Sequence, residues 1–124
     1  MLFKSQIDNS QCIGAAEIVI GAAASAAVQL PTMEGATKAI LQFFTDDAGV
    51  IVIGVSKIGY TPIAVICEST DAATQGLPGS NAGKGFLLYN LSNYEVYSQK
   101  NLQQTTIMSY ATGYNVYCRI LFYK

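Results

Sequence analysis

An alternation of apolar and polar side chains runs from residue 114 to residue 123, just before the end of the chain. The apolar set is Tyr114, Val116, Cys118, Ile120 and Phe122. The opposite set is amphipathic and contains Asn115, Tyr117, Arg119, Leu121 and Tyr123. Successive side chains of a β-strand point to opposite faces of its sheet, so a period of two residues is typical of a strand with one face in the core. The pattern predicts a long strand, and the fold of the chain must bury its apolar face.

Shorter strand-like segments recur along the rest of the chain, separated by residues that favour turns. They are residues 17–20, 26–30, 38–44, 50–53, 62–67, 85–89 and 94–98. We expect the segments at 85–89 and 94–98 to form a strand pair around the turn at 90–93. Residues 71–83 are rich in turn formers and predict one long loop. Only residues 101–108 are compatible with a short helical turn.

Short strands with regularly spaced turns indicate an all-β fold. We expect an antiparallel β-sandwich or small barrel, jelly-roll-like, with about six to nine short strands. The length of 124 residues fits one domain, and we divide it into an N-terminal arm at 1–14 and a single β domain at 15–124. The apolar stretch at 12–30 contains Glu17 and is rich in Ala and Gly. We interpret it as ordered β structure rather than a secretion signal or membrane span, and expect no membrane partner.

The charge content is low for a small domain. Charged residues make up 12% of the chain, against about 25% in typical soluble domains. The seven Lys and Arg residues are scattered singly, and no basic stripe is present. We therefore expect no nucleic-acid partner. With so few charges, the surface is covered either by a neighbouring protein or by uncharged polar side chains such as Ser, Thr, Asn, Gln and Tyr. The first of these interpretations predicts a homo-oligomer or assembly subunit.

The cysteines, Cys12, Cys67 and Cys118, are widely spaced and form neither a CxxC nor a zinc-ligand pattern. The strand-like flanks of Cys67 and Cys118 favour buried free thiols over a disulfide for this set. Such thiols indicate folding in a reducing compartment.

Catalytic and cofactor chemistry has no motif in this chain. There is no histidine, which removes the usual general base near neutral pH and the commonest zinc ligand. The acid pairs Asp46–Asp47 and Glu68–Asp71 fit turns and loop edges better than a calcium site or a glycosidase pair. The segment at 76–85 resembles a phosphate loop, but its Gly79-to-Gly83 spacing is one residue too short. We expect a non-enzyme with no catalytic, cofactor-binding or metal site.

Tyrosine is the remaining compositional feature, with eight residues and no tryptophan. All but Tyr60 lie in the final third of the chain. Tyrosine suits a sheet core, a protein interface or a carbohydrate contact, and all three interpretations stay open. Residues 50–53 are apolar on both faces, and such a strand needs cover on both sides. From these two features, the candidate partner-interface residues are Val50, Val52, Tyr110, Tyr117 and Tyr123.

The order of these signals resembles the small all-β virion proteins of tailed bacteriophages, which include capsid decoration (cement) proteins and head-fibre modules. The resemblance extends over roughly residues 15 to 124. It rests on turn and strand patterns at residues 28–31, 35–42, 71–76, 85–88, 94–96, 112–116 and 122–123.

This resemblance implies a structural protein that binds and stabilises the phage head. The implied partners are the major capsid protein and further copies of the chain, with a homotrimer favoured. The implied location is the exterior of the virion capsid, after synthesis in the cytoplasm of the bacterial host. The alternative is a glycan- or receptor-binding β module of a phage fibre, using the tyrosines and the loop at 76–85.

Overall fold

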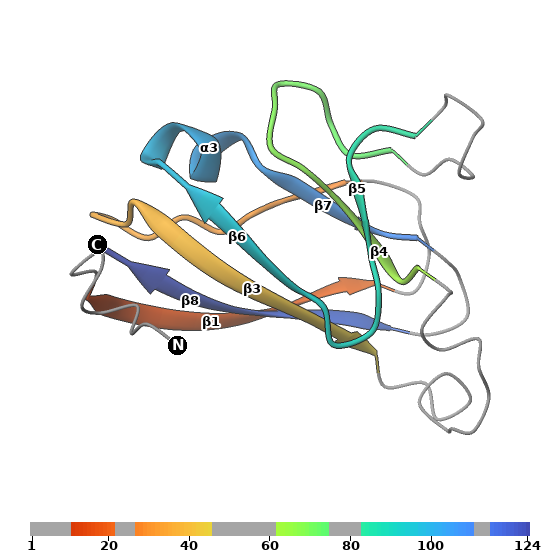
Figure 1. The fold of residues 1–124 in the computed structure, drawn as a ribbon, viewed down its shortest axis with the longest axis horizontal. Coiled ribbons are helices and arrows are strands. Elements are labelled where there is room, and N and C mark those ends of the chain that lie inside the picture. Colours follow the sequence, from red (N-terminus) through yellow and green to blue (C-terminus); the bar gives the residue numbers. More distant parts are fainter. Residues whose placement is uncertain (1–10, 22–26, 46–61, 75–82, 111–114) are drawn as a thin grey trace, which may run out of the picture.

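The computed structural model describes residues 11–21, 27–45, 62–74, 83–110 and 115–124, and the fold is an eight-stranded β-sandwich (Figure 1). Sheet A has the strand order β1 (Cys12–Gly21), β8 (Val116–Tyr123), β3 (Lys38–Thr45) and β6 (Asn93–Tyr97). Sheet B has the order β2 (Val28–Gln29), β7 (Thr106–Ser109), β4 (Ala64–Cys67) and β5 (Phe86–Leu88). A short helix, α3 (Gln99–Gln104), joins β6 to β7.

All neighbouring strands in both sheets are antiparallel. The chain repeatedly crosses from one sheet to the other, and the first and last strands lie side by side in sheet A. Two four-stranded sheets with this order make a jelly roll. The predicted all-β class and the jelly-roll-like sandwich are confirmed.

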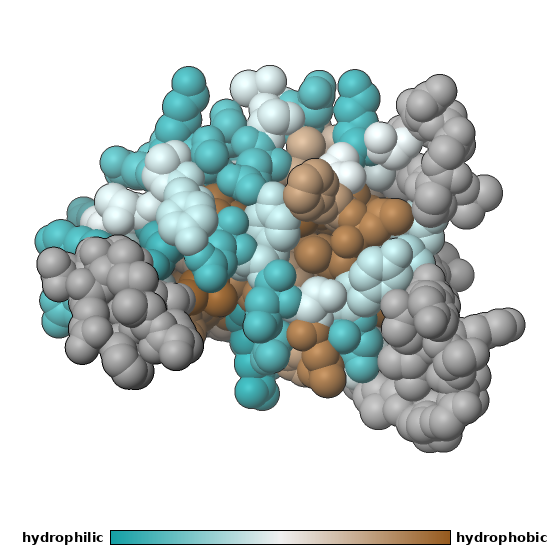
Figure 2. All heavy atoms as spheres, viewed as in Figure 1, coloured by the Kyte–Doolittle hydropathy of each residue, from teal (hydrophilic) through white to brown (hydrophobic). Residues whose placement is uncertain are grey.

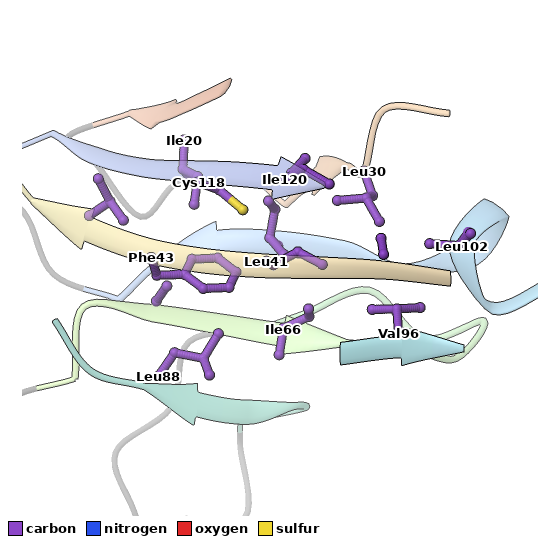
Figure 3. Packing of buried hydrophobic residues seen from close by; sticks show 14 of the residues in the cluster. Ile20, Leu30, Leu41, Phe43, Ile66, Leu88, Val96, Leu102, Cys118 and Ile120 are labelled. Carbon is purple, nitrogen blue, oxygen red and sulfur yellow. The ribbon is translucent and has the colours of Figure 1, made fainter. Parts of the chain in front are cut away.

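The pattern of the last strand is also confirmed over the described residues. Val116, Cys118, Ile120 and Phe122 are buried, whereas Arg119 and Leu121 are exposed. The buried face meets residues of β3, β4, β5 and α3 between the two sheets (Figure 3). The labelled side chains of this core include Leu41, Phe43, Ile66, Leu88 and Leu102.

The expected pairing of residues 85–89 with 94–98 is wrong. β5 pairs with β4 in sheet B, and β6 pairs with β3 in sheet A. A tight turn between the two strands, in which Ser92 N–H donates to Tyr89 O at 2.9 Å, carries the chain across the sandwich. Crossing lets Leu88 and Val96 enter the core from opposite sheets, which a hairpin within one sheet would not do.

The helical prediction at 101–108 is correct only in its first half. The helix α3 begins after Ser98, whose Oγ accepts from Asn101 N–H at 3.1 Å and caps the first turn. The remainder is β7, because Ile107 enters the core and pairs with Ile66 of β4.

Two further expectations differ in their boundaries. Thr74, in the predicted loop at 71–83, forms an isolated antiparallel bridge with Lys84, which directly follows that loop. Residues 75–82 lie outside the described residues. β1 begins at Cys12, inside the segment expected as an arm.

The prediction of buried thiols holds for Cys118, which is buried in the core. It fails for Cys12, which is exposed at the start of β1, and Cys67 is only half-buried. All three are free thiols.

The two sheets differ in how their outer faces are covered. On sheet B, Val65 and Met108 point away from the main core and form a second buried cluster with Ala73 and Tyr110. Ala73 belongs to the segment after β4, which is fixed over the sheet because Ala73 N–H donates to Thr106 Oγ1 at 2.8 Å. The chain therefore covers the outer face of sheet B with its own residues.

Candidate functional site

The outer face of sheet A consists of every second residue of its four strands, which the strand register aligns in rows. Across the sheet, these are Ala15, Glu17 and Val19 of β1, Tyr117, Arg119, Leu121 and Tyr123 of β8, Lys38, Ile40, Gln42 and Phe44 of β3, and Asn93, Glu95 and Tyr97 of β6. The alternate residues of these strands fill the core, so the sheet alternation itself sends this set outward.

Lys38 lies on this face but is only 5% exposed. Its Nζ is 4.9 Å from the ring centroid of Tyr123 and 5.9 Å from that of Tyr97. An ammonium group at such distances is attracted to the negative face of an aromatic ring. This end of the face consequently presents aromatic surface rather than an open positive charge.

A second charged group on the face is paired within the face. Glu17 of β1 and Arg119 of β8 are register neighbours, and Arg119 Nε donates to Glu17 Oε2 at 2.7 Å. The Arg119 guanidinium also lies over the ring of Phe44, 5.3 Å from its centroid. Phe44 in turn stacks on Tyr117 with 5.4 Å between the ring centroids. The guanidinium is thereby fixed between a carboxylate and an aromatic stack.

A shallow open hollow of about 660 Å³ lies in the middle of this face. Its lining residues are Ala15, Ala16, Glu17, Ile40, Gln42, Asn93, Arg119, Ile120 and Leu121. The small side chain of Ala15 makes the wall low on the β1 side, whereas Gln42 and Asn93 place amide groups at another part of the wall. The hollow therefore combines an apolar floor with a few polar groups, a combination that suits ligand and protein binding.

Large apolar side chains are exposed at only two places on the described part of the chain. Val19, Tyr97 and Leu121, which are 56%, 55% and 43% exposed, lie on the outer face of sheet A. The other two are Phe86 of β5 and Leu91 of the turn after it. Among the described residues, those of sheet B and the segment after β4 cover the outer face of sheet B, whereas the outer face of sheet A has no such cover. The outer face of sheet A is therefore the best candidate for a functional surface.

The five predicted interface residues do not form one surface. Tyr117 and Tyr123 lie on the outer face of sheet A, half-buried beside Arg119 and Leu121. Tyr110 lies across the sandwich, in the buried cluster of sheet B. Val50 and Val52 lie outside the described residues.

Sequence reasoning missed Val19, Leu121 and Tyr97 as surface residues of interest. For Leu121 the signal was present, because the alternation of the last strand placed it opposite the core face. Val19 and Tyr97 had no comparable signal, because their exposure depends on which strands lie at the two edges of sheet A.

The acids considered for chemistry have separate partners. Asp71 Oδ2 lies 4.0 Å from Lys84 Nζ. The Glu68 carboxylate accepts hydrogen bonds from the Tyr94 hydroxyl and from Asn101 Nδ2. Burial, and then the hydrogen bond and charge of Glu68, raise the pKa of Tyr94 well above its ordinary value. Asp46 and Asp47 lie outside the described residues, and within the described ranges no three His, Cys, Asp or Glu side chains gather as a metal site.

No protein-family model matches the chain, and no curated protein matches it either. Among the described residues, no helix combines the length and apolar character needed to cross a membrane.

Proposed function

We propose that this chain is a structural virion component, a capsid decoration (cement) protein that binds and stabilises a phage head. In this proposal the chain forms a homo-oligomer, with a trimer favoured, on the capsid exterior, and the major capsid protein is its partner. The observation that carries the proposal is the outer face of sheet A, which the described part of the chain leaves uncovered. The low charge content and the resemblance to phage virion proteins support the choice of assembly.

The chemistry of the face suits a protein contact. Apolar surface removed from water contributes roughly 25 cal/mol per Å², and stable interfaces bury about 800 Å² on each partner. The Glu17–Arg119 pair and the covered Lys38 lower the cost of dehydrating charge, because each charge already has a partner within the face. Contacts repeated over a shell add up, which is how a small subunit stabilises a large particle.

The oligomeric state of the purified protein tests the first half of this proposal. We expect sedimentation velocity to show an oligomer, and Leu121→Arg to convert it to monomer. Gln103→Arg is the matched control, because Gln103 is exposed on α3 and lies outside this face. A wild-type monomer at about 100 μM would contradict self-association through an interface of ordinary affinity.

Mass spectrometry of particles tests the second half. Virions of the virus that encodes the chain are washed and analysed before and after heating. We expect the chain in intact particles, and we expect particles lacking it to release their genome at a lower temperature. Its absence from washed particles would end the decoration proposal.

The hollow supports a second candidate, a glycan- or receptor-binding β module of a phage fibre. Gln42, Asn93 and the Glu17–Arg119 pair offer donors and acceptors for hydroxyl groups, and the stacked rings of Phe44 and Tyr117 lie beside Arg119. A glycan array followed by NMR titration of the hits tests this function, with Asn93→Ala expected to weaken any binding. Absence of binding to the array at millimolar oligosaccharide would rule it out.

A further inference from the structure

The two most exposed large apolar side chains in the described ranges lie near one edge of the sandwich. Phe86 is 67% exposed on β5, the last strand of sheet B, and Leu91 is 63% exposed in the turn that leads to β6. β6 is the last strand of sheet A, so this turn connects the two sheets at the same edge. Figure 2 shows apolar side chains gathered over β4 and β5 on this side of the molecule. We call Phe86 and Leu91 the edge patch.

The backbone and rings hold the edge patch in place. Leu91 has a φ of 66°, a left-handed conformation that a branched side chain rarely adopts. Hydrogen bonds from Leu91 N–H to Phe43 O (2.7 Å) and from Phe43 N–H to Ser92 O (3.0 Å) fix the turn to β3. Phe86 makes an edge-to-face contact with Tyr94, with 6.0 Å between ring centroids. Rigid, exposed apolar side chains of this kind are favourable anchors for a partner, because little conformational entropy is lost on binding.

We propose that the edge patch of one copy inserts into the hollow on the outer face of sheet A of the next copy. The inference rests on the proposed self-association and specifies which surfaces meet. The hollow has an apolar floor at Ala15, Ile40 and Leu121. The Glu17–Arg119 ion pair in its wall carries no net charge. An uncharged apolar projection fits such a hollow without burying an unpaired charge. The amide groups of Gln42 and Asn93 are placed to meet the backbone of the incoming turn.

The positions of the two surfaces favour a closed ring. Contacts between two different patches are heterologous, and they close only if each step rotates the next copy sufficiently. The edge patch borders β6, and β6 is also the outermost strand of the face that carries the hollow. Because the two surfaces are on adjoining sides rather than opposite sides, each contact turns the chain through a large angle. A large turn at each contact gives a small ring, such as a trimer, when the steps close, and a helical filament when they do not.

Cross-linking of two differently tagged proteins tests this arrangement. Both carry Cys12→Ser and Cys67→Ser, and the buried Cys118 is left in place. One then carries Leu91→Cys and the other Leu121→Cys, and a short bismaleimide is added to each alone and to the mixture. Our inference predicts a covalent dimer carrying both tags in the mixture only. Cross-linking of the Leu121→Cys protein alone would indicate a face-to-face contact, and cross-linking of the Leu91→Cys protein alone an edge-to-edge contact; either result overturns the inference.

A second variant separates assembly from folding. Leu91→Gly removes the side chain and suits the positive φ, so the monomer keeps its stability or gains some. We expect it to weaken association by about tenfold or more, whereas an unchanged association constant would overturn the edge patch as an anchor. An oligomer without any mixed cross-link would also overturn the inference but leave the proposed function standing. A monomeric wild type would instead contradict the proposed function itself.

Discussion

At the residue scale, Gly85 occupies a position that other residues cannot adopt without strain. It follows the Thr74–Lys84 bridge and enters β5 with a φ of 118°. A Cβ at this position would lie 2.4 Å from Ile66 O and 2.9 Å from Val65 Cγ1. The glycine therefore lets β5 approach β4 closely enough to pair with it.

We predict that Gly85→Ala lowers the free energy of unfolding by about 2–4 kcal/mol, because the left-handed φ and the backbone clash act together. Gly35→Ala is the control, since Gly35 also has a positive φ, 86°, but its nearest contact would be Lys124 Cδ at 4.0 Å. That variant loses about 1–2 kcal/mol from the φ alone. Urea denaturation followed by circular dichroism measures both, and equal losses would show that the clash is relieved elsewhere.

Thiol reactivity is a second residue-scale prediction. Burial raises the pKa of Cys118 to about 12, so its thiol stays protonated at pH 8 and reacts slowly with maleimides or disulfide reagents. The exposed Cys12 reacts fast in the native protein. Because the folded pKa of Cys118 is above its unfolded value, its contribution to stability is complete at neutral pH and falls as the pH rises toward 12. Mass spectrometry after timed labelling measures how fast each thiol reacts, and fast labelling of Cys118 without denaturant would contradict this prediction.

At the element scale, a polar cluster joins the two sheets and the helix. Glu68 follows β4 of sheet B, and its carboxylate accepts from Tyr94 of β6 and from Asn101 of α3, the latter at 3.2 Å. Its backbone carbonyl accepts from Gln104 Nε2 at 2.7 Å. These bonds fix α3 against the end of β4 and hold the β6 edge to sheet B.

We predict that Tyr94→Phe lowers the free energy of unfolding by about 1–2 kcal/mol, because the partly buried carboxylate loses a hydrogen-bond donor. Tyr97→Phe is the matched control, since the Tyr97 hydroxyl donates to Glu95 on the same exposed strand. Loss of that exposed contact changes the stability by less than about 1 kcal/mol. Thermal and urea unfolding compare the two variants. An equal effect would show that the cluster does not connect the sheets energetically.

The sequence predicts a strand well when the strand's own side chains determine its position, and poorly when contacts with distant residues determine it. The alternation in β8 and the apolar runs of β3 and β4 follow from side chains within each strand, so their positions were predicted closely. The partner of β5 is set by the chain crossing between sheets at Leu91, and no local pattern contains that information. The place of Tyr110 on the sheet B side was not predictable for the same reason, because it packs in a cluster with Val65 and Ala73, which are distant in the sequence.

At the scale of the whole molecule, the asymmetry between the two outer faces is the central feature. One sheet is covered by the segment after β4, while the other exposes apolar and aromatic side chains around a hollow. The low charge content is consistent with this asymmetry, because the described charges on the open face have partners within it: Glu17 and Arg119 form an ion pair and Lys38 lies over two rings. The fourth, Glu95, accepts a hydrogen bond from the Tyr97 hydroxyl. Composition therefore predicted that an uncharged surface exists, but the location of that surface depended on the order of the strands in the sheets.

If association buries this face, the thermal stability must depend on protein concentration, because a partner that binds only the folded state shifts unfolding by mass action. We predict that the Tm of the wild type rises as the protein concentration is raised about a hundredfold, whereas the Tm of Leu121→Arg stays constant. Raising the salt from about 0.05 to 1 M will not weaken the association, because the contact is apolar and the Glu17–Arg119 pair is internal to one copy. Scanning calorimetry over both series measures these effects. A Tm independent of concentration, or an oligomer that dissociates in high salt, would mean that the subunits do not associate through the apolar face of sheet A.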